Sequence, residues 1–253
     1  MMLKNKKISI IMPNYNSSEF IQKTIKSVLS QTFTNWELII IDDNSNNKTK
    51  EILKKFARNK KIRIYFLKKN KGDGYCRLFG INKAKSKIIA FIDSDDLWKK
   101  NKLKLQYDFM QRNNYEFTYT GYTAFKESDL GYKKEIIPPD NLGFEDFIKN
   151  TSIATSSMMI RKSVIKDIKI SDSPIFDDFN FKCQILRKVG YAFCLNKNLL
   201  LYRIRNKSLS QNKIKNIIWL WKINKSFNSL SFFENLSSIL SISINSLKKY
   251  GLK

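Results

Sequence analysis

An apolar run that ends in three carboxylates occupies Ile88-Ile89-Ala90-Phe91-Ile92-Asp93-Ser94-Asp95-Asp96-Leu97-Trp98. Its apolar part predicts a buried strand. Three aspartates within four positions repel one another, and one or more of them would stay protonated without a counter-ion. A hard divalent cation, which takes oxygen ligands, relieves this repulsion and leaves coordination positions for a diphosphate. The alternative is a polar turn that caps a helix beginning near Lys99, but three acids behind a strand favour the cation.

The composition predicts one folded domain with room for a small appendage. The chain has 253 residues, of which 42% are hydrophobic, so it can bury a substantial core. Its three cysteines argue against a disulfide framework and favour a reducing cytosol. It contains no histidine, which excludes serine–histidine and cysteine–histidine triads and argues against a zinc site.

The net charge is +25, from 47 lysines and arginines against 22 acidic residues. Such a surface attracts polyanions, including acidic membranes and anionic glycolipids, although a general bias toward lysine, asparagine and isoleucine explains the charge equally well. The basic residues are spread along the chain, so we expect no dedicated nucleic-acid arm. No stretch reaches the roughly 18 apolar residues of a membrane span, and residues 1–7 lack the long apolar region of a secretory signal. We therefore expect a cytoplasmic protein.

Strands and amphipathic helices alternate in the first half of the chain. Strands are predicted at Ile8–Met12, Glu37–Ile41, Ile62–Leu67 and Ile88–Ile92. This alternation predicts an α/β fold whose mostly parallel central sheet is flanked by helices. Ligands bind beyond the carboxyl ends of such strands. Three polar clusters follow predicted strands there: Pro13–Asn16, Asp42–Ser45 and Asp93–Asp96.

The second half of the chain is less regular. Helices are predicted at Lys102–Arg112 and around Phe179, Cys183 and Leu186, and strands at Tyr115–Tyr119, Ser156–Ile160 and Leu199–Tyr202. Asp177 and Asp178 lie in the first turn of the later helix, where the helix dipole alone would favour acidic residues.

The last part of the chain, from about Lys213 to Lys248, predicts a C-terminal helical extension. Two apolar stripes have helical spacing and lysines nearby: Ile214, Ile217, Ile218 and Trp221 form one, and Leu236, Leu240, Ile244 and Leu247 form the other. Three alternatives stay open for these stripes: contact with an anionic membrane surface, packing on their own domain, or packing on a sister subunit. The last would make a homodimer.

Together, the ordered motifs resemble the inverting family 2 glycosyltransferases of bacterial surface-polysaccharide synthesis, which have the Rossmann-like GT-A fold. The resemblance is dense from about residue 8 to 105 and thinner beyond. It rests on Ser9–Asn16, Thr24–Phe33, Trp36–Ser45, Arg77, Phe91–Asp96, Thr155–Ser157, Asp177-Asp178 and Tyr202-Arg203. It implies a GT-A domain at 1–210, with a nucleotide-binding half at 1–105 and an acceptor-binding half at 106–210. Residues 211–253 would form the amphipathic helical extension.

The resemblance also implies a reaction, the transfer of a sugar from a nucleotide diphosphate, usually UDP, to an acceptor hydroxyl. The nucleotide would contact Pro13, Tyr15, Asn16, Asp43, Arg77, Asp93 and Asp95. Tyr15 would lie against the base above a turn shaped by Pro13, and Asp43 would accept the uracil N–H. Asp93 or Asp95 would hold ribose or water. Asp95 and Asp96 would hold Mg²⁺ or Mn²⁺, which stabilises the charge of the leaving diphosphate.

The same resemblance implies that Asp178 is the general base that activates the acceptor hydroxyl, giving a single displacement with inversion. Asp177 replaces the glutamate that is usual before this base. The family often has a histidine shortly after the tyrosine–arginine pair, and this chain has Arg205 there. We expect Asp177, Arg203 and Arg205 to contact the acceptor or the diphosphate, which arginine binds in bidentate fashion.

Two classes of function follow. The leading prediction is a metal-dependent inverting glycosyltransferase with a nucleotide-sugar donor and a surface-glycan, glycolipid or lipopolysaccharide acceptor. It would work in the cytoplasm or peripherally at the inner face of the membrane, without nucleic acid. The alternative is a non-catalytic module on the same fold that binds a nucleotide sugar or a polyanion.

Overall fold

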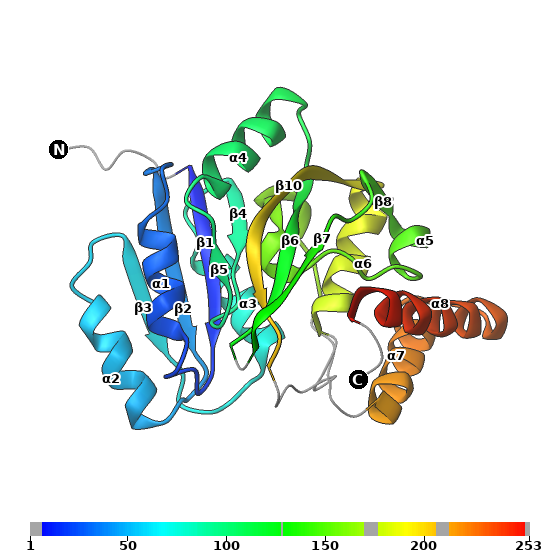
Figure 1. Cartoon of the computed structure of the whole chain (residues 1–253), viewed down its shortest axis with the longest axis horizontal. Helices are drawn as coiled ribbons and strands as arrows, with labels where there is room; N and C mark the ends of the chain where they lie inside the picture. Colours follow the sequence, from blue (N-terminus) through cyan, green and yellow to red (C-terminus); the bar gives the residue numbers. More distant parts are fainter. Residues whose placement is uncertain (1–6, 128, 170–176, 206–212, 251–253) are drawn as a thin grey trace.

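A computed structural model describes residues 7–127, 129–169, 177–205 and 213–250 of the chain. A ten-stranded sheet crosses the molecule, with helices on both sides (Figure 1). The strands are β1 (Ile8–Asn14), β2 (Trp36–Asp42), β3 (Ile62–Phe66), β4 (Ile88–Phe91), β5 (Leu97–Trp98), β6 (Phe117–Lys126), β7 (Asp129–Ile136), β8 (Asn141–Gly143), β9 (Met159–Arg161) and β10 (Tyr191–Arg203). The helices are α1 (Ile21–Leu29), α2 (Asn47–Phe56), α3 (Asp73–Lys83), α4 (Lys102–Arg112), α5 (Phe144–Phe147), α6 (Asp177–Val189), α7 (Lys213–Ser226) and α8 (Phe232–Tyr250), with 3-10 turns η1 (Thr155–Ser157) and η2 (Lys162–Ile165).

The strand order is β3-β2-β1-β4-β9-β6-β10-β5, with β7 beside β6 and β8 beside β10. β1 pairs in parallel with β2 on one side and with β4 on the other, and β10 pairs in parallel with β6. Among the described strands of this order, only β9 and β5 run against the rest. The predicted α/β fold with a mostly parallel central sheet is confirmed.

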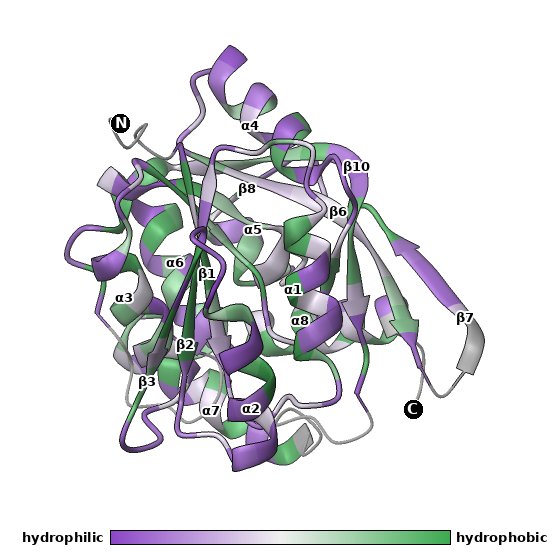
Figure 2. Cartoon of the chain, turned by 90° about the vertical axis from the view of Figure 1, so that its left-hand side faces the viewer, coloured by the Kyte–Doolittle hydropathy of each residue, from purple (hydrophilic) through white to green (hydrophobic). Residues whose placement is uncertain are grey.

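Alternate residues of the central strands point to opposite faces of the sheet, and each face has its own core. Ile10 and Ile40 belong to a cluster that also contains Ile25 of α1 and Leu53 of α2. Ile11 belongs to the cluster on the other face, which α3, α5 and α6 cover. In Figure 2 the apolar strands lie between helices whose ribbons alternate between hydrophobic and hydrophilic residues. The parallel pairing of β1 with β2 and with β4 brings the carboxyl ends of these three strands to one edge of the sheet.

The second half differs from the prediction in the number and length of its strands. β6 continues to Lys126 and β10 begins at Tyr191, so both are longer than expected. β7 and β8 are additional strands. β7 has the sequence DLGYKKEI, which lacks the alternation of a half-buried strand. In β10, register shifts on both sides of Asn198 divide the strand into two segments, and the prediction covered only the second, at Leu199–Tyr202.

The predicted C-terminal helices are present as a hairpin of two helices, α7 and α8. The chain turns between them at Ser229, which has a φ of 54°. Polar bonds fix the hairpin to the domain: Asn228 Nδ2 donates to Cys183 Sγ at 3.7 Å, and Ser238 Oγ donates to the Ile148 carbonyl at 2.6 Å. The predicted boundary between residues 210 and 211 lies outside the described residues. Within those residues, every helix is too short or too polar to cross a membrane.

Candidate active site

The three predicted polar clusters lie at the carboxyl ends of β1, β2 and β4, and hydrogen bonds join the first two. Asn14 is buried, and its Nδ2 donates to Asp42 Oδ1 at 2.7 Å and to Ser45 Oγ at 3.3 Å. The Asn16 N–H donates to the same Ser45 Oγ at 2.9 Å, and Asn16 Oδ1 accepts the Asn46 N–H at 2.8 Å. Asn16 therefore helps to shape the loop at this edge of the sheet.

Pro13 does not form part of a turn, which corrects the expectation for this residue. It lies buried within β1 opposite Ile41 of β2, beyond Ile11, the last β1 residue that pairs with β4. A proline fits there because the ladder to β4 has ended and its missing N–H leaves no bond unmade. Tyr15 follows the strand and is 48% exposed, so its ring is accessible to a ligand.

Asp43 is buried just after β2, and its carboxylate closes a loop. Its Oδ1 accepts the Lys71 N–H at 2.7 Å and its Oδ2 accepts the Gly72 N–H at 2.8 Å. Gly72 has a φ of 85°, a conformation that glycine adopts without steric cost. Acceptance of a uracil N–H by Asp43 stays a prediction and would use the remaining lone pairs of these oxygens.

Arg77 on α3 lies between two carboxylates. Its Nη2 donates to Asp93 Oδ1 at 3.1 Å and lies 4.0 Å from Asp73 Oδ2. Desolvation raises the pKa of Asp73, and Arg77 opposes this rise. The charges of Asp93, Asp43 and Asp178 add to it. The charges of these three carboxylates and of Arg77 therefore all act on the pKa of Asp73. The sequence motifs did not indicate Asp73 as a residue of the site.

Asp95 and Asp96 contact two arginines at the end of β10. Asp95 Oδ2 lies 3.3 Å from Arg205 Nη1, and the Asp95 carbonyl accepts from Arg203 Nε at 2.7 Å. Asp96 is buried: its Oδ1 accepts the Arg203 N–H at 2.9 Å, and its Oδ2 has no hydrogen-bond partner among the described residues. Burial and the charge of Asp93 raise the pKa of Asp95 to about 6, although Arg205 opposes this. Burial and the charge of Asp95 raise the pKa of Asp96 well above its usual range.

This pair of aspartates fits a divalent cation. Carboxylate oxygens are the hard ligands that Mg²⁺ and Mn²⁺ prefer. Asp96 Oδ2 is buried and accepts no hydrogen bond from any part of the chain that the structure describes. Burial and mutual repulsion disfavour the ionised forms, and a bound cation would reverse this. In the described part of the chain, no three aspartate, glutamate or cysteine side chains converge as a ready set of ligands. The protein would therefore supply two carboxylates and leave the other positions to ligands from outside it.

Asp178, in the first turn of α6, is held by two donors on the same oxygen. Its Oδ2 accepts from Lys182 Nζ at 2.7 Å and from Thr155 Oγ1 at 3.1 Å. Lys182 is itself buried, one turn further along α6. Burial raises the pKa of Asp178, but the charges of Lys182 and Arg77 outweigh this and hold that pKa well below its usual range. The carboxylate is therefore ionised, and the bonds to Oδ2 orient Oδ1.

The turn η1 links the acidic cluster to Asp178. Ser156 Oγ accepts the Asp93 N–H at 2.9 Å, and the Ser156 carbonyl accepts from Trp98 Nε1 at 2.8 Å. Thr155, which donates to Asp178, immediately precedes Ser156. One short backbone turn therefore fixes the two predicted parts of the site relative to each other.

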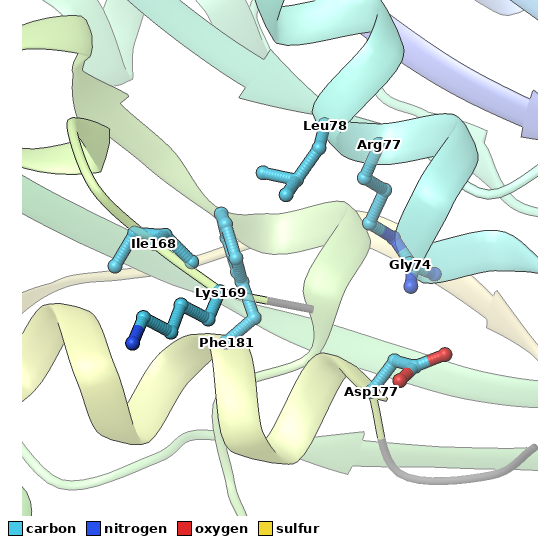
Figure 3. A pocket seen from close by; sticks show the side chains of 7 residues that line it. All are labelled: Gly74, Arg77, Leu78, Ile168, Lys169, Asp177 and Phe181. Carbon is cyan, nitrogen blue, oxygen red and sulfur yellow. The ribbon is translucent and has the colours of Figure 1, made fainter. Parts of the chain in front are cut away.

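Asp177 begins α6 where this helix approaches α3. A Cβ added at Gly74 would come within 2.8 Å of Asp177 Cγ, so the two helices meet as closely as a glycine allows. Figure 3 shows a small pocket beside this contact, lined by Asp177 and Phe181 from α6 and by Arg77 and its neighbours from α3. Asp177 and Arg77 therefore face the same space.

Some residues of the site carry only a weak signal in the sequence. Lys182 lies four residues after Asp178, a spacing that pairs an acid with a base on a helix. Glu127 pairs with Arg203 at 2.6 Å but belongs to no motif, so its contact emerges only from the fold. The contacts of Thr155 and Ser156 likewise depend on the sheet that brings η1 beside β4.

Residues 9–169 match the model of glycosyl transferase family 2. TuaG of Bacillus subtilis, whose name assigns it provisionally to teichuronic acid biosynthesis as a glycosyltransferase, is 32% identical over 243 residues, which cover 96% of each chain. WfaP of Escherichia coli, named UDP-Glc:alpha-D-GlcNAc-diphosphoundecaprenol beta-1,3-glucosyltransferase, is 32% identical over 247 residues, 96% of this chain and 95% of its own.

Two solved structures share the fold. Residues 1–349 of TarS from Staphylococcus aureus, in complex with UDP-GlcNAc, give a TM-score of 0.73 at 18% identity over 96% of this chain and 73% of that one. The mannosyltransferase PcManGT from Pyrobaculum calidifontis, in complex with GDP-Man and Mn²⁺, gives 0.67 at 10% identity over 99% and 77% of the two chains. The fold they share with this chain is GT-A. The family model matches most of the chain, and two relatives are 32% identical to it over nearly its whole length. This protein therefore belongs to glycosyl transferase family 2 and is a glycosyltransferase.

Proposed function

We propose that this glycosyltransferase moves a sugar from a UDP-linked donor to a hydroxyl of a lipid-linked surface glycan, with inversion and with Mg²⁺ or Mn²⁺ bound. The observation that carries the proposal is the fixed placement of Asp178. Its Oδ2 is held by Lys182 and Thr155, and η1 ties the same segment to Asp93. An ionised carboxylate thus stands at a set position beside an acidic cluster suited to a diphosphate.

The donor would lie along the carboxyl ends of β1, β2 and β4. The accessible ring of Tyr15 and the carboxylate of Asp43 suit the base, and Arg203 and Arg205 suit the diphosphate. Asp95 and Asp96 would hold the divalent ion. When bound, such an ion stabilises the negative charge that develops on the departing diphosphate.

The acceptor would approach from the side of α6. Asp178 accepts the proton of the acceptor hydroxyl on Oδ1, while that hydroxyl oxygen forms a bond to the anomeric carbon. The bond from the anomeric carbon to the diphosphate oxygen breaks in the same displacement, and UDP leaves. Asp177, one residue earlier on the same helix turn, would contact the acceptor.

The names of the relatives support the donor and acceptor classes. WfaP is named for a UDP-Glc donor and a diphosphoundecaprenol-linked acceptor, and TarS was solved with UDP-GlcNAc. TuaG is named for teichuronic acid biosynthesis, which supports a cell-surface polysaccharide as the product class. The net charge of +25 also suits an anionic, lipid-linked acceptor.

Thermal shift with UDP, with and without Mn²⁺, tests the donor and metal, and a turnover assay then tests the reaction. The proposal predicts stabilisation by UDP that requires the metal, followed by metal-dependent release of UDP from a UDP-sugar. Stabilisation without any turnover would favour the non-catalytic nucleotide-sugar binder. Salt-sensitive nucleic-acid binding that survives Asp95→Asn, without a UDP response, would favour a polyanion-binding module.

A further inference from the structure

One face of α8 exposes five large apolar side chains, which we call the outer stripe: Phe233, Leu236, Leu240, Ile244 and Leu247. They are three, four, four and three residues apart, so they lie on one side of the helix. Their exposed fractions run from 41% to 80%. Single exposed apolar residues are ordinary, but a contiguous row of them marks an interaction site.

The outer stripe is not part of the core, because another face of α8 already packs on the domain. Asn235 Oδ1 and Ser238 Oγ both accept from Asn224 Nδ2 of α7, at 3.0 and 3.1 Å. Ile239 is buried in the core cluster that includes α6. Packing on its own domain, one of the three predicted alternatives, is therefore wrong for the outer stripe. The described part of the chain leaves the stripe uncovered.

A second exposed row on α7 continues the apolar surface. It comprises Ile214, Ile217 and Ile218, which are 72%, 44% and 47% exposed. The ring of Trp221 on α7 lies 5.4 Å from that of Phe232, which lies 5.6 Å from that of Phe233. The two rows therefore meet at an aromatic cluster where the hairpin turns. In Figure 1 the hairpin stands at one end of the molecule, to one side of the sheet.

Positive charge accompanies this apolar surface. Residues 213–250 contain six lysines and one glutamate. Lys222 and Lys225 are exposed on α7. They lie four residues after Ile218 and Trp221, so they stand beside the apolar row. Lys248 is exposed next to the end of the outer stripe. An apolar face bordered by lysines is typical of helices that lie in the plane of a membrane surface.

We propose that the α7–α8 hairpin docks the protein peripherally on an anionic lipid bilayer, with the outer stripe at the acyl chains and the lysines at the head groups. Charge decides between this partner and a second copy of the chain. Two copies that met through this face would bring their lysines together, within molecules that each carry a net charge of +25. An anionic surface instead attracts each of these lysines.

The test is co-sedimentation of the full chain with vesicles of phosphatidylcholine alone and of phosphatidylcholine mixed with phosphatidylglycerol. We expect binding to the mixed vesicles that weakens as salt is added. The double substitution Phe233→Ser and Leu240→Ser should weaken binding by at least about tenfold. Lys222→Gln with Lys225→Gln should weaken it by roughly thirtyfold at low salt.

The matched control replaces two exposed apolar residues elsewhere, Phe66→Ser with Ile137→Ser, which are 43% and 57% exposed in the native chain. This control should bind mixed vesicles like the native protein. Equal loss in control and outer-stripe variants, or no preference for phosphatidylglycerol, would overturn the proposal. So would a dimer in sedimentation velocity that Leu240→Ser dissociates. Vesicle binding is measured without donor or acceptor, so failure here leaves the proposed reaction untouched.

Discussion

Lys182 Nζ donates a hydrogen bond of 2.7 Å to Asp178 Oδ2, one helical turn away. The lysine is buried, so its charge acts on the carboxylate with little screening by solvent. Burial would otherwise raise the pKa of Asp178, and the lysine charge is the largest influence that lowers it. The candidate base is therefore kept ionised and oriented by a residue of its own helix.

Lys182→Met should move the acid limb of the pH profile of kcat/KM to higher pH. Methionine keeps much of the length and packing of the side chain but removes the cation. Without the lysine charge, burial should raise the pKa of Asp178. Each unit by which that pKa exceeds the assay pH lowers the ionised fraction about tenfold. Lys182→Arg retains a cation and should keep the limb near its native position. A lower kcat with an unmoved profile in Lys182→Met would assign the lysine a structural role only.

Gly74→Ala should impair acceptor use selectively. Alanine favours the helix by about 1 kcal/mol, but its Cβ would lie 2.8 Å from Asp177 Cγ, so that side chain must move. We expect a several-fold higher KM for the acceptor and an unchanged thermal shift with UDP. The matched control is Gly80→Ala on the same helix, whose Cβ would meet Ile11 and Ile41 in the core at 2.7 Å. It should lower the melting temperature instead, and equal effects on donor and acceptor in Gly74→Ala would contradict the role of Asp177.

Asp95→Asn should abolish the part of the UDP-induced thermal shift that depends on Mn²⁺. It removes one of the two carboxylates proposed to hold the ion, and turnover should fall by roughly a hundredfold or more. Asp108→Asn is the control, because Asp108 pairs with Lys104 on the surface of α4, outside the site. A native metal response in Asp95→Asn would exclude this carboxylate from the cation site.

Lys102→Met should stabilise the protein near neutral pH. Lys102 is fully buried, and burial lowers its pKa to about 7, against about 10.4 in an unfolded chain. Between these two pH values the unfolded chain binds more protons at this lysine than the folded chain does. The contribution of Lys102 to the unfolding free energy therefore rises with pH, and it is least favourable below pH 7. The gain should be on the order of 2 kcal/mol at pH 7, after the lost bond to Gln106 is counted.

Urea unfolding of Lys102→Met and the native chain at pH 7 and pH 9 measures this difference. The gain in unfolding free energy should be smaller at pH 9, because removing the proton that Lys102 carries in the unfolded chain costs less free energy as the pH approaches the unfolded pKa. A gain independent of pH would show that the buried amine is not what costs stability.

The edge of the sheet that carries the acidic cluster could be predicted because two simple rules agree. An apolar run at Ile88–Ile92 predicts a strand, and parallel sheets present their carboxyl ends at one edge. Asp43 and Asp93 are therefore neighbours of one site, as expected. Pro13 shows the limit of this reasoning: proline favours turns in general, but here it lies in a strand beyond the end of one ladder.

The C-terminal helices show why the rest could not be predicted. Hydrophobic spacing correctly indicates the apolar rows of α7 and α8 but not which face packs on the domain. The packed face includes Asn224, Asn235 and Ser238, which satisfy one another by hydrogen bonds. The spacing of apolar residues cannot indicate a contact surface that is made of polar side chains. The contact of Lys182 with Asp178 could have been predicted, because residues four apart on a helix lie on the same side of it.

The most direct test of the proposed reaction is a screen of UDP-sugars for release of UDP with Mn²⁺ and a polyprenyl-diphosphate-linked acceptor. The native protein should turn over at least one donor, the chelator EDTA should stop it, and Asp178→Asn should lose activity by about a hundredfold or more while UDP still stabilises it with Mn²⁺. Turnover by Asp178→Asn at the native rate would contradict the central claim that this carboxylate takes the proton of the acceptor.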